Sequence, residues 1–234
     1  MKLVKIKGYN DFQLCGYAWD NVENPKGVVQ IIHGMQEHAK RYDDFAKFLN
    51  TQGLIVFASD LRGHGQTAII NNLPFGYSDG DIFWEIVQDQ IKITDYLSKK
   101  YKLPVSIFGH SFGSMIAQRY MVENGFKIKN IIICGSTYCN SFQFRAGYHM
   151  AKLCRFFRGK KAAAKLIEKM SLQGYGKKFK EGNWLSRDEN NWKNYQKDEL
   201  CGKVFPNNFY WSFFKNARNN YKNLNNIPYY LPIF

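Results

Sequence analysis

Hydrophobic and polar side chains alternate along the first twenty residues of the chain. Residues 2–7 and 12–19 both show a period of two and flank the turn-forming letters GYND. This pattern predicts an antiparallel β-hairpin. Four later stretches are short and almost continuously apolar: 27–34, 54–60, 103–108 and 128–136. Such runs are typical of strands that are buried on both faces of a parallel sheet.

Apolar residues between these runs recur at helical spacing. One such segment spans 39–51 and ends before Gly53, a common helix stop. The same spacing indicates helices at about 81–100 and at 112–124. A hairpin followed by alternating strands and helices predicts an α/β fold with a mostly parallel sheet.

The character of the sequence changes after residue 136. Residues 137–227 are rich in lysine, asparagine and aromatic residues, with short helical patterns such as 160–170 and no convincing strand. Residues 228–234 are strand-like again. We therefore expect a core at 1–136, a helical cap insertion at 137–227 and the start of a further core strand at 228–234.

The charge of the chain is its most unusual compositional feature. Thirty-three Lys and Arg residues against 19 Asp and Glu residues give a formal net charge of +14, with local clusters at 158–161 and 177–180. No nucleic-acid-binding motif accompanies this charge, so we expect no nucleic-acid partner. We interpret the lysines first as a solvated surface and second as an attraction to anionic membrane lipid.

The hydropathy of the sequence predicts neither a signal peptide nor a membrane span. The N-terminus is too polar for a signal peptide, and no run reaches the roughly 18 apolar residues of a membrane span. We expect a cytoplasmic protein that contacts membranes peripherally at most. The five cysteines form no CxxC pair and are predicted to be reduced. The sequence predicts no metal site and no cofactor.

A serine stands between two glycines at residues 109–113, GHSFG. This is the G-x-S-x-G pattern of a nucleophile elbow, and it has the required buried strand before it and amphipathic helix after it. Ser111 is therefore the candidate nucleophile. We expect the backbone N–H groups of Met35 and Phe112 to form the oxyanion hole, and His33 to brace the oxyanion loop.

Three separated motifs resemble one branch of the α/β-hydrolases. They are H-G-x-x-E-H…R-Y at 33–42, D-x-R-G-H-G at 60–65 and the elbow itself, and the letters WLSRD (184–188) and YQKDELCG (195–202) resemble the cap of bacterial members. The branch comprises monoacylglycerol lipases and bacterial lysophospholipases, also classed as serine aminopeptidase-like hydrolases. The resemblance implies a helical cap over an acyl chain and hydrolysis of a monoacylglycerol or lysophospholipid ester.

Neighbouring residues are assigned supporting roles. Glu37 and Arg41 are four apart and are predicted to form an ion pair that holds the oxyanion loop. Arg62 and His64 are predicted to order the loop after Asp60 instead of touching substrate. For the aromatic stretch FPNNFYWSFF at 205–214, an acyl pocket and core packing are equally compatible with the sequence.

The partners of Ser111 are missing from the expected positions. Such hydrolases carry them in the order Ser…Asp/Glu…His, but of the five histidines only His149 follows Ser111, at the start of the cap. The positions of the acid and the histidine in the family would fall beyond Phe234. We therefore expect an incomplete α/β-hydrolase whose C-terminal strands, triad acid and triad histidine are absent from this sequence, and which is close to inactive on its own.

These observations favour a serine ester hydrolase that forms an acyl-enzyme and uses a lipid ester as substrate. A peptidase or small-ester hydrolase of the same fold is an alternative, because the elbow indicates acyl transfer and not the acyl group. A non-catalytic, degenerate hydrolase that binds lipid or a partner is the alternative from another class.

Overall fold

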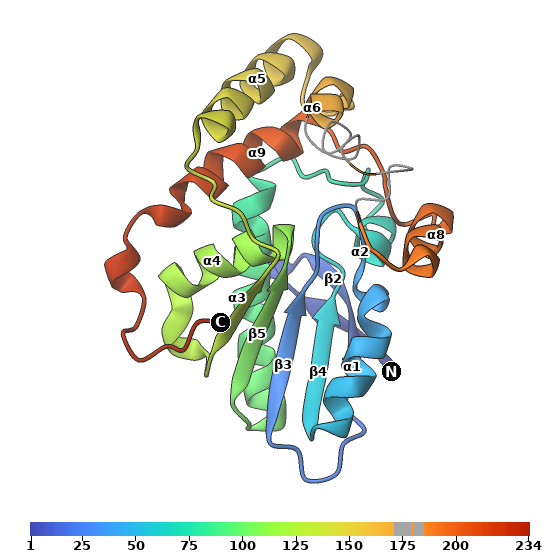
Figure 1. The fold of residues 1–234 in the computed structure, drawn as a ribbon, viewed down its shortest axis with the longest axis vertical. Helices are drawn as coiled ribbons and strands as arrows, with labels where there is room; N and C mark the ends of the chain where they lie inside the picture. Colours follow the sequence, from blue (N-terminus) through green and yellow to red (C-terminus); the bar gives the residue numbers. More distant parts are fainter. Residues whose placement is uncertain (171–178, 180–184) are drawn as a thin grey trace.

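A six-stranded mixed sheet forms the centre of the structure, a computed structural model that describes residues 1–170, 179 and 185–234 (Figure 1). Its strand order is β1-β2-β4-β3-β5-β6. The strands are β1 (Lys2–Lys7), β2 (Gln13–Trp19), β3 (Gly27–Ile32), β4 (Leu54–Ser59), β5 (Val105–His110) and β6 (Ile131–Cys134). The two N-terminal strands run antiparallel and β3 to β6 are mutually parallel. The predicted hairpin and the α/β fold are confirmed.

Helices cover both faces of this sheet. On one face lies α1 (Asp43–Thr51), and on the other lie α3 (Ile82–Tyr101) and α4 (Phe112–Asn124). Neighbouring residues of β3 serve the two sides, because Val28 packs with the α3 cluster and Val29 with the α1 cluster. A strand covered on both faces needs an almost continuous apolar run, which explains the sequence of β3.

A second group of helices lies over the carboxyl ends of the parallel strands (Figure 1). It comprises α5 (Phe142–Arg158), α6 (Lys165–Met170), α8 (Glu189–Lys197) and α9 (Asn207–Ala217). Aromatic residues of α9 share one hydrophobic cluster with α3 and α4. None of the helices in the described part of the chain is long and apolar enough to cross a bilayer.

The end of the sequence lies beside β6. Ile233 forms a parallel bridge with Ile131, and the Phe234 N–H donates to the Ile131 carbonyl at 2.9 Å. This pairing has the direction expected for a further core strand. The boundaries of core and cap at residues 136 and 227 stay a prediction.

The structure differs from the expected elements in three places. The strand expected at 128–136 is limited to Ile131–Cys134. The glycine-rich loop after Asp60 contains a short helix, α2 (Gly65–Ile70), which buries Thr67 and Ala68. Within 160–170 only the second half is helical. The basic cluster at 177–180 lies outside the described residues apart from Phe179, as does Trp184 of the WLSRD motif.

Candidate active site

Ser111 forms the sharp turn between the end of β5 and the start of α4. Its backbone dihedrals are φ 52° and ψ −118°, a region that costs a non-glycine residue about 1–3 kcal/mol. The Ser111 N–H donates to the Cys134 carbonyl at 2.9 Å, and the Ser111 carbonyl accepts from the Ser114 N–H at 2.9 Å. These bonds hold the serine in the strained geometry of a nucleophile elbow.

The glycines around Ser111 allow three backbone segments to meet. A Cβ on Gly113 would lie 2.0 Å from the Ile32 carbonyl oxygen, and one on Gly109 would lie 2.6 Å from the Gly113 carbonyl oxygen. A Cβ on Gly34 would lie 3.4 Å from the Ser111 Cβ. The loop after β3 therefore lies directly beside Ser111.

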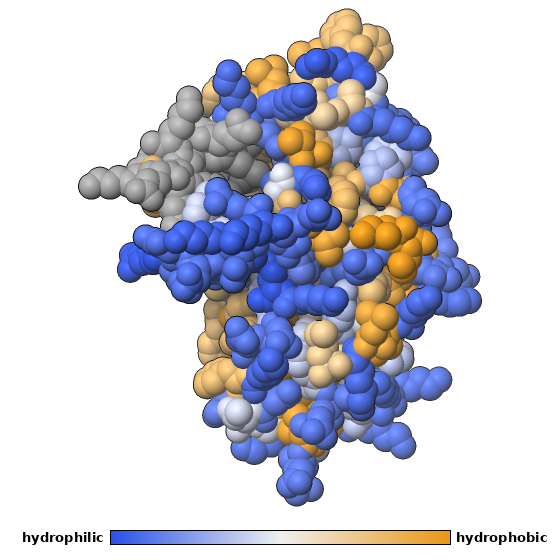
Figure 2. Space-filling model, turned by 90° about the vertical axis from the view of Figure 1, so that its right-hand side faces the viewer, coloured by the Kyte–Doolittle hydropathy of each residue, from blue (hydrophilic) through white to orange (hydrophobic). Residues whose placement is uncertain are grey.

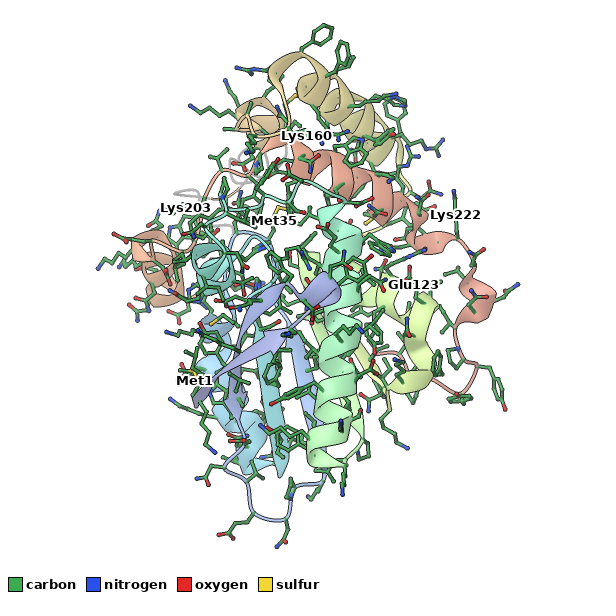
Figure 3. The ribbon with its side chains drawn as sticks, turned by 180° about the vertical axis from the view of Figure 1, so that it is seen from behind. Met1, Met35, Glu123, Lys160, Lys203 and Lys222 are labelled. Atoms are coloured by element: carbon green, nitrogen blue, oxygen red, sulfur yellow. The ribbon has the colours of Figure 1, made fainter. Side chains whose placement is uncertain are left out.

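Two backbone N–H groups next to Ser111 are free to bind an oxyanion. Met35 follows Gly34 in the loop after β3, and Phe112 is the first residue of α4. Among the described residues, no group accepts a hydrogen bond from the Met35 N–H or the Phe112 N–H. Figure 3 labels Met35 between the sheet and the helices above it. The assignment of these two N–H groups to an oxyanion hole stays a prediction.

Glu37 fixes the loop from within. Its Oε1 accepts from the Gly34 N–H at 2.6 Å and from the Tyr42 hydroxyl at 2.8 Å, while its Oε2 accepts from Arg41 Nε at 3.0 Å. Burial alone would raise the pKa of the Glu37 carboxyl, but the His110 imidazole, whose Nδ1 lies 3.5 Å from Oε1, and the Tyr42 hydroxyl outweigh burial and lower this pKa to about 2. The predicted Glu37–Arg41 ion pair is present, and it holds the loop.

His33 uses both of its ring nitrogens in structural contacts. Its Nε2 accepts from the Leu61 N–H at 3.0 Å, and its Nδ1 lies 2.8 Å from the Gly34 carbonyl oxygen, to which the protonated Nδ1 donates. Burial lowers the pKa of His33, so the ring is neutral. His33 therefore braces the loop after β3, as predicted, with both ring nitrogens in use.

The loop after β4 is ordered by buried charges. Asp60 accepts from the Ala39 N–H at 2.8 Å and from the Gln66 N–H at 2.7 Å. Arg62 donates to both carboxylate oxygens of Asp89 at 2.9 and 3.0 Å. Arg62 thus orders the loop, as predicted. Its partner Asp89 was missed, although its place on the inward stripe of α3 was a signal in the sequence.

His64 lies in an apolar setting between the two helical groups. Its ring stacks on Phe112 with centroids 6.2 Å apart and contacts Phe205 edge-on at 4.9 Å. Nδ1 donates to the Arg62 carbonyl at 3.0 Å. Burial lowers the pKa of His64 to about 3. This histidine is a neutral core residue.

We expect His64 to make the fold acid-sensitive. Between its ordinary pKa of 6.5 and its folded value of about 3, the unfolded chain binds a proton that the folded chain does not. Stability is therefore lost as the pH falls through this window, by about 1.4 kcal/mol per pH unit. Urea unfolding at a series of pH values measures this slope. His64→Phe is expected to flatten it by about 1 kcal/mol per unit, and an unchanged slope would contradict the assignment.

The histidines contact groups other than the Ser111 side chain or lie exposed. His38 Nε2 contacts Asp198 Oδ2 at 2.7 Å, and His110 Nδ1 contacts the Tyr42 hydroxyl at 2.9 Å. His149 is exposed on α5. All five histidines lie in the described residues, and none of them hydrogen-bonds to Ser111 Oγ.

The aromatic stretch at 205–214 packs as core. Phe205, Phe209 and Tyr210 are at most 2 % exposed. The Phe209 ring lies 5.3 Å from the Phe112 ring and 4.6 Å from the Phe205 ring. These side chains fasten α9 to the body of the protein, so the structure favours core packing over an acyl pocket for this stretch.

One group of side chains has the composition of a metal site. The donor atoms of His38, Asp198 and Cys201 lie within 4.8 Å of one another, the one such group among the described residues. Burial raises the pKa of the Cys201 thiol to about 12, and the Arg41 guanidinium faces it. The positive charge of Arg41 would repel a bound metal cation. We therefore interpret His38, Asp198 and Cys201 as a polar link between the loop after β3 and the turn after α8.

Sequence reasoning also missed Glu168, a buried acid on α6. Its Oε1 accepts from Gln36 Nε2 at 2.8 Å and from the Tyr210 hydroxyl at 2.9 Å. In the sequence, the only signal was that Glu168 follows the apolar Ile167 in a short helical pattern, and such a pattern does not indicate which side of the helix faces inward. In the structure both side chains are buried.

Comparisons with known proteins identify the family of the chain. Residues 23–234 match the family described as Hydrolase_4, serine aminopeptidase S33. Human monoglyceride lipase is 36 % identical over 113 residues, which are 48 % of this chain and 35 % of that protein. Monoacylglycerol lipase of Mycolicibacterium smegmatis is 32 % identical over 108 residues, 44 % of this chain and 35 % of that protein. The matches thus span about a third of the length of these curated relatives.

Solved structures share the fold. A thermostable carboxyl esterase from Bacillus coagulans, in complex with glycerol, superposes with a TM-score of 0.85 at 23 % identity, covering 99 % of this chain and 77 % of that one. A monoglyceride lipase variant from Saccharomyces cerevisiae gives a TM-score of 0.69 at 19 % identity, covering 96 % and 70 %. At these identities the likeness shows the fold alone.

Proposed function

Because the chain belongs to the serine aminopeptidase S33 family of α/β-hydrolases, we propose that it is built as a serine ester hydrolase for a monoacylglycerol or lysophospholipid. The observation that carries this proposal is the strained Ser111 elbow beside two unpaired backbone N–H groups. The similarity to monoglyceride lipases supports a lipid ester as the substrate class.

Each part of the site has a defined task in acyl transfer. Ser111 Oγ attacks the ester carbonyl carbon, and its proton passes to a general base. The carbonyl oxygen becomes an oxyanion that accepts from the Met35 and Phe112 N–H groups. The tetrahedral intermediate expels the alcohol, which takes up the proton, and water then hydrolyses the acyl-enzyme to release the fatty acid.

We further propose that the general base and its acid are not among residues 1–234. Each of the five histidines is held elsewhere or exposed on α5, which supports this proposal. The same observation keeps a non-catalytic, lipid- or partner-binding role as the second candidate. A peptidase or small-ester hydrolase differs only in the substrate that the cap admits.

Covalent labelling tests the role of Ser111. The folded chain, incubated with a fluorophosphonate probe, is expected to form a slow adduct that mass spectrometry maps to Ser111, and added imidazole should accelerate it by supplying a base. Ser111→Ala should form no adduct, and neither should the urea-unfolded chain. An adduct on another serine, or none in the folded chain with imidazole, would refute the assignment.

We also propose that α5 rests on an anionic membrane surface. Phe142, Phe156 and Phe157 are 82 %, 80 % and 77 % exposed. The helix carries four arginines and lysines and no acidic residue. A hollow of about 560 Å³ on it is lined by His149, Lys152, Leu153, Arg155, Phe156 and Lys160. Figure 2 shows apolar side chains beside hydrophilic ones at the end of the molecule that α5 occupies.

Phe156→Ser with Phe157→Ser is expected to weaken binding to phosphatidylglycerol-containing vesicles by about 10–100-fold, because two rings no longer enter the interface. Vesicle sedimentation measures this affinity. Phe126→Ser removes a 64 % exposed ring on another element and serves as the control. Equal loss in both variants, or equal binding to pure phosphatidylcholine, would contradict the proposal.

A further inference from the structure

The oxyanion loop is attached to the cap at the residue that follows Met35. Gln36 has φ +58°, a left-handed conformation that a non-glycine residue rarely adopts. It is 7 % exposed. Its side chain donates to Glu168 Oε1 at 2.8 Å, and its carbonyl oxygen accepts from the Gly202 N–H at 2.9 Å. Both polar ends of this strained residue are therefore held by residues of the cap.

Glu168 is the centre of this attachment. One of its oxygens, Oε1, accepts from Gln36 Nε2, from the Phe205 N–H at 2.9 Å and from the Tyr210 hydroxyl at 2.9 Å. Glu168 is 5 % exposed, and no Lys, Arg or His of the described residues pairs with it. Burial raises the pKa of its carboxyl, which the three donors oppose. A buried carboxylate held by neutral donors alone is costly, and its placement calls for an explanation.

The same cluster touches the oxyanion donor itself. The Tyr210 hydroxyl that binds Glu168 also lies 3.9 Å from Met35 Sδ. Met35 is thus held by the contact of its own side chain with Tyr210 and by the hydrogen bonds of the neighbouring Gln36. A positive φ is unfavourable for glutamine and persists only while other contacts hold it. Without these contacts, we expect Gln36 to relax to another backbone conformation and the Met35 peptide to turn away from Ser111.

We propose that Glu168 is a positioning residue of the cap, which fixes Gln36 and so aims the Met35 N–H at the oxyanion. This inference rests on the proposed role of Ser111 and deepens it. It makes a correctly docked cap a requirement for the oxyanion hole as well as a cover for the acyl chain.

Two readouts test the proposal. In Glu168→Ala, hydrogen exchange of the amides at 34–37 should accelerate about tenfold. The maximal rate of Ser111 phosphonylation with imidazole should fall about 5–30-fold while the concentration for half-maximal rate changes less than about threefold. Glu168→Gln should recover most of both, because its amide oxygen still accepts. The control Glu199→Ala, which removes an exposed cap carboxylate, should behave as the unsubstituted chain.

Gln36→Leu provides the test if Glu168→Ala does not fold, because it leaves the residues of α6 unchanged. It should reproduce both the faster exchange at 34–37 and the loss of rate, with the concentration for half-maximal rate again changed less than about threefold. Unchanged exchange and rate with only a lower melting temperature would overturn the proposal. If no variant labels Ser111 at all, the proposed function fails, and the exchange data still decide whether Glu168 orders the loop.

Discussion

Ester hydrolysis by the 234-residue chain is expected to run about 10⁴–10⁶-fold below that of a complete serine–histidine–acid site, and Ser111→Ala is expected to lower it by less than about threefold more. Serine and base act as a unit, so losing the second member costs little once the first is absent. We expect the remaining rate to come from substrate binding and from the proposed oxyanion donors, the N–H groups of Met35 and Phe112. Hydrolysis of a p-nitrophenyl ester and of a monoacylglycerol measures both quantities.

The opposite result would be equally informative. A loss of about 10³-fold or more in Ser111→Ala would mean that a base within the chain already activates the serine. His149→Ala would then identify or eliminate the one histidine that follows Ser111. In that case the proposal that the base lies outside residues 1–234 would be wrong, while the role of Ser111 would stand.

Gly113→Ala is expected to destabilise the fold by more than about 4 kcal/mol. The added Cβ would lie 2.0 Å from the Ile32 carbonyl oxygen and 2.6 Å from the His33 carbonyl oxygen. Both contacts are with backbone atoms, so no side chain can rotate away, and β3 and α4 would have to separate. The free energy of unfolding in urea measures the effect.

Gly159→Ala is the control without a steric contact. Gly113 has the backbone of helix α4, whereas Gly159 has φ +86° and ψ 162°, and a Cβ at Gly159 meets nothing within 4 Å. The control should therefore cost only the backbone penalty, about 1–3 kcal/mol. A loss in Gly113→Ala no larger than that in Gly159→Ala would contradict the argument that the close approach of β3 to the elbow makes Gly113 necessary.

The predictable parts of this fold are those whose physical constraint is local. Burial on both faces requires an apolar run at 27–32, and the meeting of strand and helix requires glycine at 109 and 113. These local patterns also predicted the order of the hairpin, the strands and the helices along the chain. The sharp turn at Ser111 and the loop packed against it after β3 were identifiable because each depends on a short motif in a defined context.

The parts that escaped prediction depend on contacts between distant segments. The pairing of Arg62 with Asp89 and of Gln36 with Glu168 joins residues that no spacing rule connects. The stretch at 205–214 could not be assigned for the same reason, since aromatic composition does not reveal which surface it faces. Only the docking of α9 on α3 and α4 decides that these rings form core.

Phe112 limits how this protein could be re-engineered. Its N–H is one of the two proposed oxyanion donors, while its ring is 2 % exposed and lies 5.3 Å from Phe209 and 5.8 Å from Phe213 of α9. A transplanted cap of different specificity would need an aromatic surface of the same shape at this position. Without it, the exchange would leave a void beneath the proposed oxyanion donor. Substrate range and catalytic geometry therefore cannot be varied independently in this architecture.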